Sequence, residues 1–64
     1  MLALTRREQE VLNLLRDRLI DREIADSLSI GVPMAESHLA RVLAKLGAPI
    51  RREAMAVAVR LGLA

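Results

Sequence analysis

Apolar residues recur along this 64-residue chain at the spacing of helical faces. The first apolar face has the spacing i, i+1, i+4 and i+8 and consists of Val11, Leu12, Leu15 and Leu19. Thr5 followed three residues later by Glu8 is the capping-box pattern that starts a helix. The pattern predicts a first helix that begins after Thr5 and ends near Asp17.

A second, shorter apolar cluster predicts a helix over residues 22–28. Asp21 directly precedes it, and a side-chain carboxylate at that place can accept a hydrogen bond from a free backbone N–H of the first turn. We therefore expect Asp21 to be its N-cap. Residues 29–32 are expected to form a turn of four residues.

The third predicted helix covers residues 33–46 and is the longest of the chain. Gly31 is expected to act as its N-cap, and Pro33 is tolerated in a first turn because the N–H that it lacks has no helical partner there. Gly47 is expected to end the helix in the left-handed conformation, and Pro49 prevents further helix. One side of this helix is apolar and is formed by Ala35, Leu39, Val42, Leu43 and Leu46.

The fourth predicted helix, residues 51–61, carries two apolar stripes on nearly opposite sides. The expected core stripe consists of Ile50, Ala54, Val57, Ala58 and Leu61, and the second consists of Met55, Ala56, Val59 and Leu63. One monomer of this size cannot bury both. We expect the second stripe to be a homodimer interface. The alternatives are contact with an amino-terminal regulatory domain outside this chain, or a mere effect of alanine-rich composition.

Composition narrows the fold class to all-α. The chain is 53% apolar but has no Phe, Tyr or Trp, so its core must come from small and aliphatic side chains that suit closely packed helices. It also has no cysteine, which excludes disulfides and cysteine-based zinc sites. We expect a single domain over residues 1–64 with no cofactor and no metal. Without a signal-peptide pattern or a long apolar run, we expect a cytoplasmic protein that does not interact with membranes.

Charge gives weak support for nucleic-acid binding. Ten basic and eight acidic residues leave a net charge of only +2, but nine of the ten basic residues are arginine. Arginine is suited to bidentate contacts with phosphate and guanine. Binding to double-stranded DNA would therefore require these charges to be segregated onto one face.

A short helix, a turn and a longer helix form a helix-turn-helix arrangement, which alone is weak support for DNA binding. The sequence resembles the LuxR-type helix-turn-helix family, the carboxy-terminal DNA-binding domain of many quorum-sensing regulators and two-component response regulators. The resemblance rests on Leu4-Thr5, Arg7-Glu8, Glu10-Val11-Leu12, Leu14-Leu15, Leu19, Glu23-Ile24-Ala25, Leu28, Ile30, His38-Leu39, Lys45-Leu46-Gly47, Arg51, Ala54, Ala58 and Gly62-Leu63. It implies a four-helix domain that regulates transcription, with helices two and three as the helix-turn-helix and helix four as a common dimerisation surface.

The chain departs from this family where the family touches DNA. Members usually carry Ser, Thr, Val and Lys at the positions of Gly31, Met34, Ala35 and Glu36. An acid at position 36 repels phosphate, although a glutamate can accept a hydrogen bond from cytosine N4. Two further departures precede the second helix, where Arg18 replaces the usual Gly and Ile20 replaces the usual Ser.

The expected DNA-contacting residues lie on or beside the third helix. They are Arg22, Met34, Glu36, Ser37, His38, Arg41 and Lys45. For each, the alternative is an ordinary solvated or packed side chain, and for His38, the only histidine, packing or hydrogen bonding is favoured over metal or base chemistry. We expect no enzymatic activity. The alternative function is a protein-interaction module, in which the small surface of Ser37, Ala40 and Ala44 packs on a partner protein.

Overall fold

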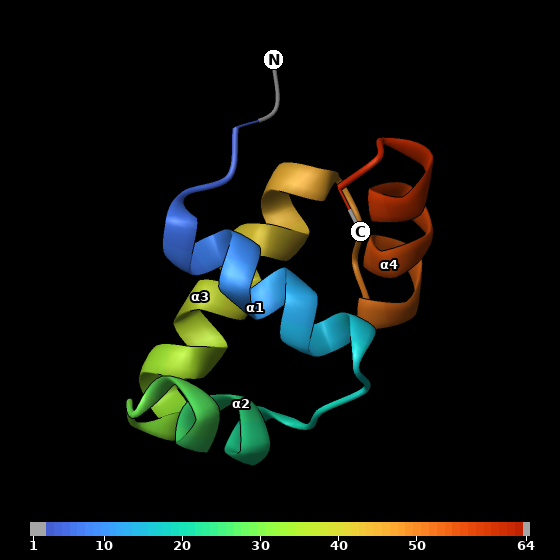
Figure 1. Ribbon diagram of the computed structural model, residues 1–64. Coiled ribbons are helices and arrows are strands. Elements are labelled where there is room, and N and C mark those ends of the chain that lie inside the picture. Colours follow the sequence, from blue (N-terminus) through green and yellow to red (C-terminus); the bar gives the residue numbers. More distant parts are fainter. Residues whose placement is uncertain (1–2, 64) are drawn as a thin grey trace.

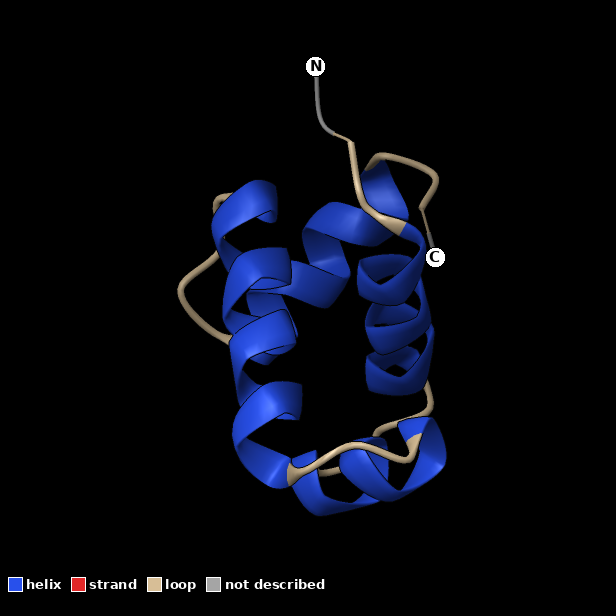
Figure 2. Ribbon diagram, turned by 90° about the vertical axis from the view of Figure 1, so that its left-hand side faces the viewer, coloured by secondary structure: helices blue, strands red, loops and turns tan. Residues whose placement is uncertain are grey.

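The computed structural model describes residues 3–63, which form four helices and no strand. The helices are α1 (Arg6–Arg16), α2 (Asp21–Leu28), α3 (Val32–Leu46) and α4 (Arg51–Arg60). α3 crosses α1 near its middle, while α2 packs beside the start of α3 and α4 beside its end (Figures 1 and 2). This arrangement confirms the expected all-α class and places α3 against all three other helices.

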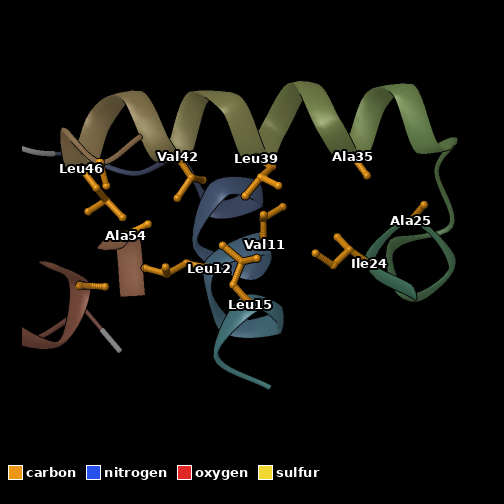
Figure 3. Packing of buried hydrophobic residues seen from close by; sticks show 12 residues of the cluster. Val11, Leu12, Leu15, Ile24, Ala25, Ala35, Leu39, Val42, Leu46 and Ala54 are labelled. Atoms are coloured by element: carbon orange, nitrogen blue, oxygen red, sulfur yellow. The ribbon is translucent and has the colours of Figure 1, made fainter. Parts of the chain in front are cut away.

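The core lies beneath α3, where side chains from the other helices meet its inner face (Figure 3). It consists of Val11, Leu12, Leu15, Ile24, Ala25, Ala35, Leu39, Val42, Leu46, Ala48, Ala54 and Ala58. Leu12, Ile24 and Val42 are among the side chains that are completely enclosed. The apolar faces predicted for the first three helices therefore make up most of the core, and Leu43 is only partly buried at its edge.

The predicted signals for the ends of α1 and α3 are confirmed. The Glu8 N–H donates to Thr5 Oγ1 over 3.1 Å, and the Thr5 N–H donates to Glu8 Oε1 over 2.9 Å, which completes the capping box. Gly31 is the N-cap of α3, and Gly47 ends it with a φ of +66°. Because a Cβ at such an angle is strained, glycine is the residue that fits position 47 best.

The start of α2 corrects one prediction. Asp21 is already the first residue of the helix, and its N-cap is Ile20, which has no side chain able to accept a hydrogen bond. Glu23 replaces part of the missing cap, since its Oε1 accepts the Ile20 N–H over 2.9 Å. The following turn is also shorter than expected, because α3 begins at Val32 and leaves residues 29–31 between the helices.

α4 corrects a second prediction, because its core stripe is narrower than the sequence indicates. Only Ala54 and Ala58 are buried on α4, and these small side chains let the helix approach its neighbours closely. Ile50 precedes the helix and is 46% exposed, while Leu61 is its C-cap and is 55% exposed. These two residues were wrongly assigned to the core. In the second stripe, Met55 and Leu63 pack partly against the core, while Ala56 and Val59 are exposed.

Two further findings concern residues 3–63 as a whole. None of their helices has the length and apolar character that a membrane span requires. Within the same residues, no group of three or more histidine, aspartate or glutamate side chains is arranged to hold a metal ion.

Candidate nucleic-acid interface

The corner between α2 and α3 is fixed by local backbone hydrogen bonds. Ser29 ends α2 with a φ of +57°, and the Ile30 N–H then donates to the carbonyl of Ala25 over 3.0 Å. At the start of α3, the N–H groups of Met34 and Ala35 both donate to the carbonyl of Gly31 over 3.1 Å. With both helix ends satisfied, the corner holds α3 at a defined angle to α2.

The outer face of α3 is exposed and consists mainly of small side chains. At about 100° per residue, Ser37, Ala40 and Ala44 lie opposite the buried face of the helix. Arg41 lies on one flank of this strip and Glu36 on the other, and both are exposed. A surface of this kind lets another molecule approach the α3 backbone closely, with one positive and one negative side chain beside it.

The other predicted contacts lie nearby in sequence but in different surroundings. Met34 is exposed in the first turn of α3, whereas His38 is partly buried at the edge of its inner face. Arg22 is exposed and belongs to the first turn of α2. The structure thus places Met34, Glu36, Ser37 and Arg41 on the outer surface of one helix, with Arg22 on the other helix of the corner.

Lys45 is held at the other end of α3 by an ion pair with Glu8. Its Nζ donates to Glu8 Oε1 over 2.6 Å and to the carbonyl of Ala3 over 3.0 Å. The Glu8 side chain is only 4% exposed. The hydrogen bond from Lys45, followed by that from the Thr5 backbone, holds the pKa of Glu8 below its ordinary value of 4.5, although burial opposes this shift. The pair fixes the last turn of α3 to the first turn of α1.

A second polar link joins the corner to α4. Arg51 forms an ion pair with Asp21 and also donates from Nη1 to the carbonyl of Leu19 over 3.0 Å. At the other end of α4, Gln9 Nε2 donates to the carbonyl of Leu63 over 3.1 Å. α4 is therefore tied to the rest of the domain at both ends by hydrogen bonds.

Comparison with known proteins agrees with this architecture. Over residues 2–58, the sequence matches the family described as bacterial regulatory proteins, luxR family. The chain belongs to the luxR family. No curated protein matches the chain. The luxR-family domain is a helix-turn-helix DNA-binding domain of transcription regulators, so the corner of α2 and α3 is the helix-turn-helix unit of this chain.

Sequence reasoning missed the two ion pairs that link different helices of this luxR-family domain. Glu8 was interpreted only as part of the capping box and Lys45 only as a DNA contact, yet the two side chains meet across 37 positions of sequence. Asp21 was interpreted as a cap, whereas its carboxylate pairs with Arg51. The available signal was an acid in the first turn of one helix and a base at an end of another, the last turn of α3 for Lys45 and the first turn of α4 for Arg51. This signal alone cannot identify the partner.

Proposed function

We propose that α3 is the recognition helix of a sequence-specific transcription regulator and enters the major groove of DNA with its outer face. The observation that carries this proposal is the contrast between the two sides of α3: the inner side is packed against three helices, and the outer side is exposed and small. A helix with side chains is about 10–12 Å wide, which fits a major groove about 12 Å wide. Ser37, Ala40 and Ala44 allow this close approach.

The side chains around the small strip would divide the contacts between bases and phosphates. Arg41 is suited to a guanine edge or a phosphate, and Met34 to a thymine methyl group. Glu36 can accept a hydrogen bond from cytosine N4 while repelling nearby phosphates, so it would alter sequence preference. The Ser37 hydroxyl can form a hydrogen bond with a base or with a phosphate.

The remaining residues would position the domain on the duplex. Arg22 in α2 is proposed to contact a phosphate, and the partly buried His38 to lie beside the DNA backbone. Lys45 uses two of its three ammonium donors within the domain, so its remaining donor is the one proposed for a phosphate.

We also propose that two copies dimerise through α4, using Met55, Ala56, Val59 and Leu63. The exposed apolar side chain of Val59 supports this assignment, because α4 leaves it uncovered in a single copy. A symmetric dimer would place two copies of α3 in consecutive major-groove half-sites about 34 Å apart, and the operator would then be nearly palindromic.

The first test is binding to random duplex DNA by fluorescence anisotropy over a series of salt concentrations. Phosphate contacts release counterions, so we expect affinity to fall steeply with salt, with a log–log slope of several units. Arg41→Glu should abolish this binding while circular dichroism shows an intact fold. Arg16→Glu, with the same charge change in the last turn of α1, is the control and should retain most of the affinity. Full affinity in the Arg41 variant would exclude that residue from the interface.

Dimerisation is tested by Val59→Asp in analytical ultracentrifugation. An aspartate at the centre of an apolar interface would be desolvated without a partner, so this variant should sediment as a monomer. Val32→Asp is the matched control, because Val32 is also exposed but lies in α3. A Val59 variant with the mass of the unmodified protein would rule out this face of α4.

The second candidate function is a protein-interaction module with weak or no DNA binding, and Glu36 is the observation that favours it. An exposed acid beside the strip of Ser37, Ala40 and Ala44 suits a protein partner better than a polyanion. A contact formed by apolar burial would vary little with salt, unlike phosphate binding. Absence of binding to random duplex even at low salt would favour this second function.

A further inference from the structure

A groove of about 550 Å³ lies between the carboxy-terminal end of α1, the following loop and α4. Its apolar lining includes Leu15, Leu19, Met55 and Val59. Four arginines also line it, namely Arg16, Arg18, Arg51 and Arg52. Figure 1 shows the end of α1 and the start of the loop beside the first turn of α4. An apolar surface and a concentration of positive charge thus occur together, outside the corner proposed to bind DNA.

The arginines of this groove are incompletely neutralised. Arg51 is paired with Asp21, and Arg16 is only loosely paired, since its Nε lies 4.0 Å from Asp17 Oδ1 on an exposed surface. Within residues 3–63, Arg18 and Arg52 form no ion pair. The groove therefore has at least two guanidinium groups available to an external anion.

Arg18 is also held in a strained backbone conformation. Its φ is +63°, in the left-handed region that glycine adopts easily and that side chains with a Cβ disfavour. The N–H groups of Arg18 and Leu19 donate to the carbonyls of Leu15 and Leu14 over 2.9 and 3.3 Å, so Arg18 occupies the left-handed position after a helix that glycine usually fills. An arginine at this position adds a guanidinium to the groove lining that a glycine would not supply.

The apolar part of the groove includes two side chains that are more than half exposed. Ile20, which also lines it, is 60% exposed, and Val59 is 61% exposed. Covering these side chains releases water from apolar surface and is favourable in proportion to the area covered. An occupant with an apolar body and an anionic end would satisfy both parts of the lining.

We propose that this groove binds a small amphiphilic anion, with an unbranched alkyl chain over Leu19, Met55 and Val59 and a carboxylate at Arg18 and Arg52. The volume falls within the range of about 300–1,000 Å³ that is typical of small-molecule sites. A stable protein interface needs about 800 Å² from each partner, far more than the walls of this groove.

Occupancy of the groove would compete with the dimer proposed above. Met55, Ala56 and Val59 line the groove and also belong to the proposed dimer face. A bound alkyl chain would cover them and favour the monomer, which would lower affinity for a two-half-site operator. This consequence rests on the proposed function, whereas binding of the anion to the groove does not.

The experiment is isothermal titration calorimetry of the full chain with octanoate, decanoate and decyltrimethylammonium, each below the concentration at which it forms micelles. Each added CH₂ that becomes buried should tighten binding about four-fold, so decanoate should bind up to about 15-fold more tightly than octanoate. Decyltrimethylammonium has the same chain length but a cationic head and should bind far more weakly than decanoate. Equal binding of the two decyl compounds, or equal binding of the two carboxylates, would overturn the proposal.

Arg18→Gly separates a role in binding from a role in folding. Glycine accepts a φ of +63° without strain, so the variant should unfold at the same temperature as the original protein or a higher one. Loss of a charged hydrogen-bond donor should weaken decanoate binding about ten-fold or more. Arg52→Gln is the second variant with the same expectation for binding, and Arg60→Gln, which lies outside the groove lining, is the control. Unchanged decanoate affinity in both groove variants would overturn the assignment.

Sedimentation of the protein with saturating decanoate then tests the competition. A shift from dimer to monomer is the expected result. If decanoate binds with the expected chain-length and charge dependence while the dimer persists, the α4 dimer face is wrong and the ligand site stands. If decanoate does not bind and the dimer forms, the ligand site is wrong and the proposed function stands.

Discussion

α3 and α4 are both amphipathic helices of one small domain, yet they are held in different ways. α3 buries Ala35, Leu39, Val42 and Leu46 against the other helices, and its two ends are fixed by the corner and by the Lys45 ion pair. α4 buries only Ala54 and Ala58. Its larger side chains at positions 59 and 61 are more than half exposed.

This difference fits the two tasks proposed for these helices, DNA contact for α3 and dimerisation for α4. Apolar burial stabilises in proportion to area, so the aliphatic side chains of α3 contribute far more to folding than two alanines of α4. α3 is therefore the more firmly packed of the two helices. α4 is linked to its neighbours by the hydrogen bonds of Arg51 and Gln9 and leaves the apolar side chain of Val59 exposed.

The largest expected effect comes from truncating one leucine on each helix. Leu39→Ala, on the inner face of α3, should lower the free energy of unfolding by about 2–5 kcal/mol, because it removes buried methyl groups and leaves a cavity. Leu61→Ala, at the exposed end of α4, should change it by less than about 0.5 kcal/mol. Urea unfolding followed by circular dichroism measures both values.

The two variants carry the same chemical change, so each is the control for the other. Equal destabilisation would mean that α4 is as tightly integrated into the monomer as α3. α4 would then not be the more loosely packed helix. Repeating the measurement at several protein concentrations would show whether a dimer stabilises it.

The second prediction concerns the ion pair that ends α3. Because the pKa of Glu8 is lower in the folded protein than in the unfolded chain, the unfolded chain binds more protons as the pH falls below about 4.5. The stabilisation from Glu8 is therefore fully present above this pH and is lost as the pH falls through the lowered folded pKa. Glu8→Gln should lower stability at pH 7 and flatten its dependence on pH below 4.5, as measured by urea unfolding at a series of pH values.

Glu10→Gln provides the control for this experiment. Glu10 is in the same helix, but its partner Arg7 lies 3.9 Å away on a half-exposed surface, where ion pairs contribute little. The Glu10 variant should therefore retain the acid dependence of the original protein. If both variants lose that dependence equally, Glu8 is not its source.

Local sequence signals predicted the helices of this domain well. The periodicity of α1 and α3 identified most of the core, and the capping box at Thr5 and the glycine at position 47 set two helix ends. These features depend on residues within one or two helical turns. They are therefore visible in a single sequence.

Long-range contacts explain where prediction failed. Ile50 and Leu61 fit the periodicity of α4 but are exposed, whereas Met55 and Val57 pack partly against the core. Nothing within the helix reveals how far a neighbour extends. The Glu8 and Lys45 pair and the Asp21 and Arg51 pair likewise join residues on different helices. For the candidate DNA interface, the sequence identified the exposed side of α3. The ion pair of Lys45 with Glu8 and the groove lined by arginines could be found only from the three-dimensional structure.

The smallest expected effect tests whether the outer face of α3, and not net charge alone, governs DNA binding. Glu36→Lys replaces a repulsive acid by a base beside the strip of Ser37, Ala40 and Ala44. One additional phosphate contact should increase the log–log salt slope by about one and strengthen binding to random duplex at low salt. Fluorescence anisotropy at several salt concentrations measures both quantities.

Glu53→Lys is the matched control, because Glu53 is an exposed acid in the first turn of α4 and its reversal changes the net charge equally. Long-range attraction acts on both variants, but only a residue close to the phosphates displaces counterions and changes the slope. If α3 lies in the major groove of DNA and α4 carries the dimer contact, the log–log salt slope should increase for Glu36→Lys and not for Glu53→Lys. Equal salt slopes for the two variants would show that binding depends on the overall charge of the domain. The proposed assignment of DNA contact to α3 and dimerisation to α4 would then no longer account for binding.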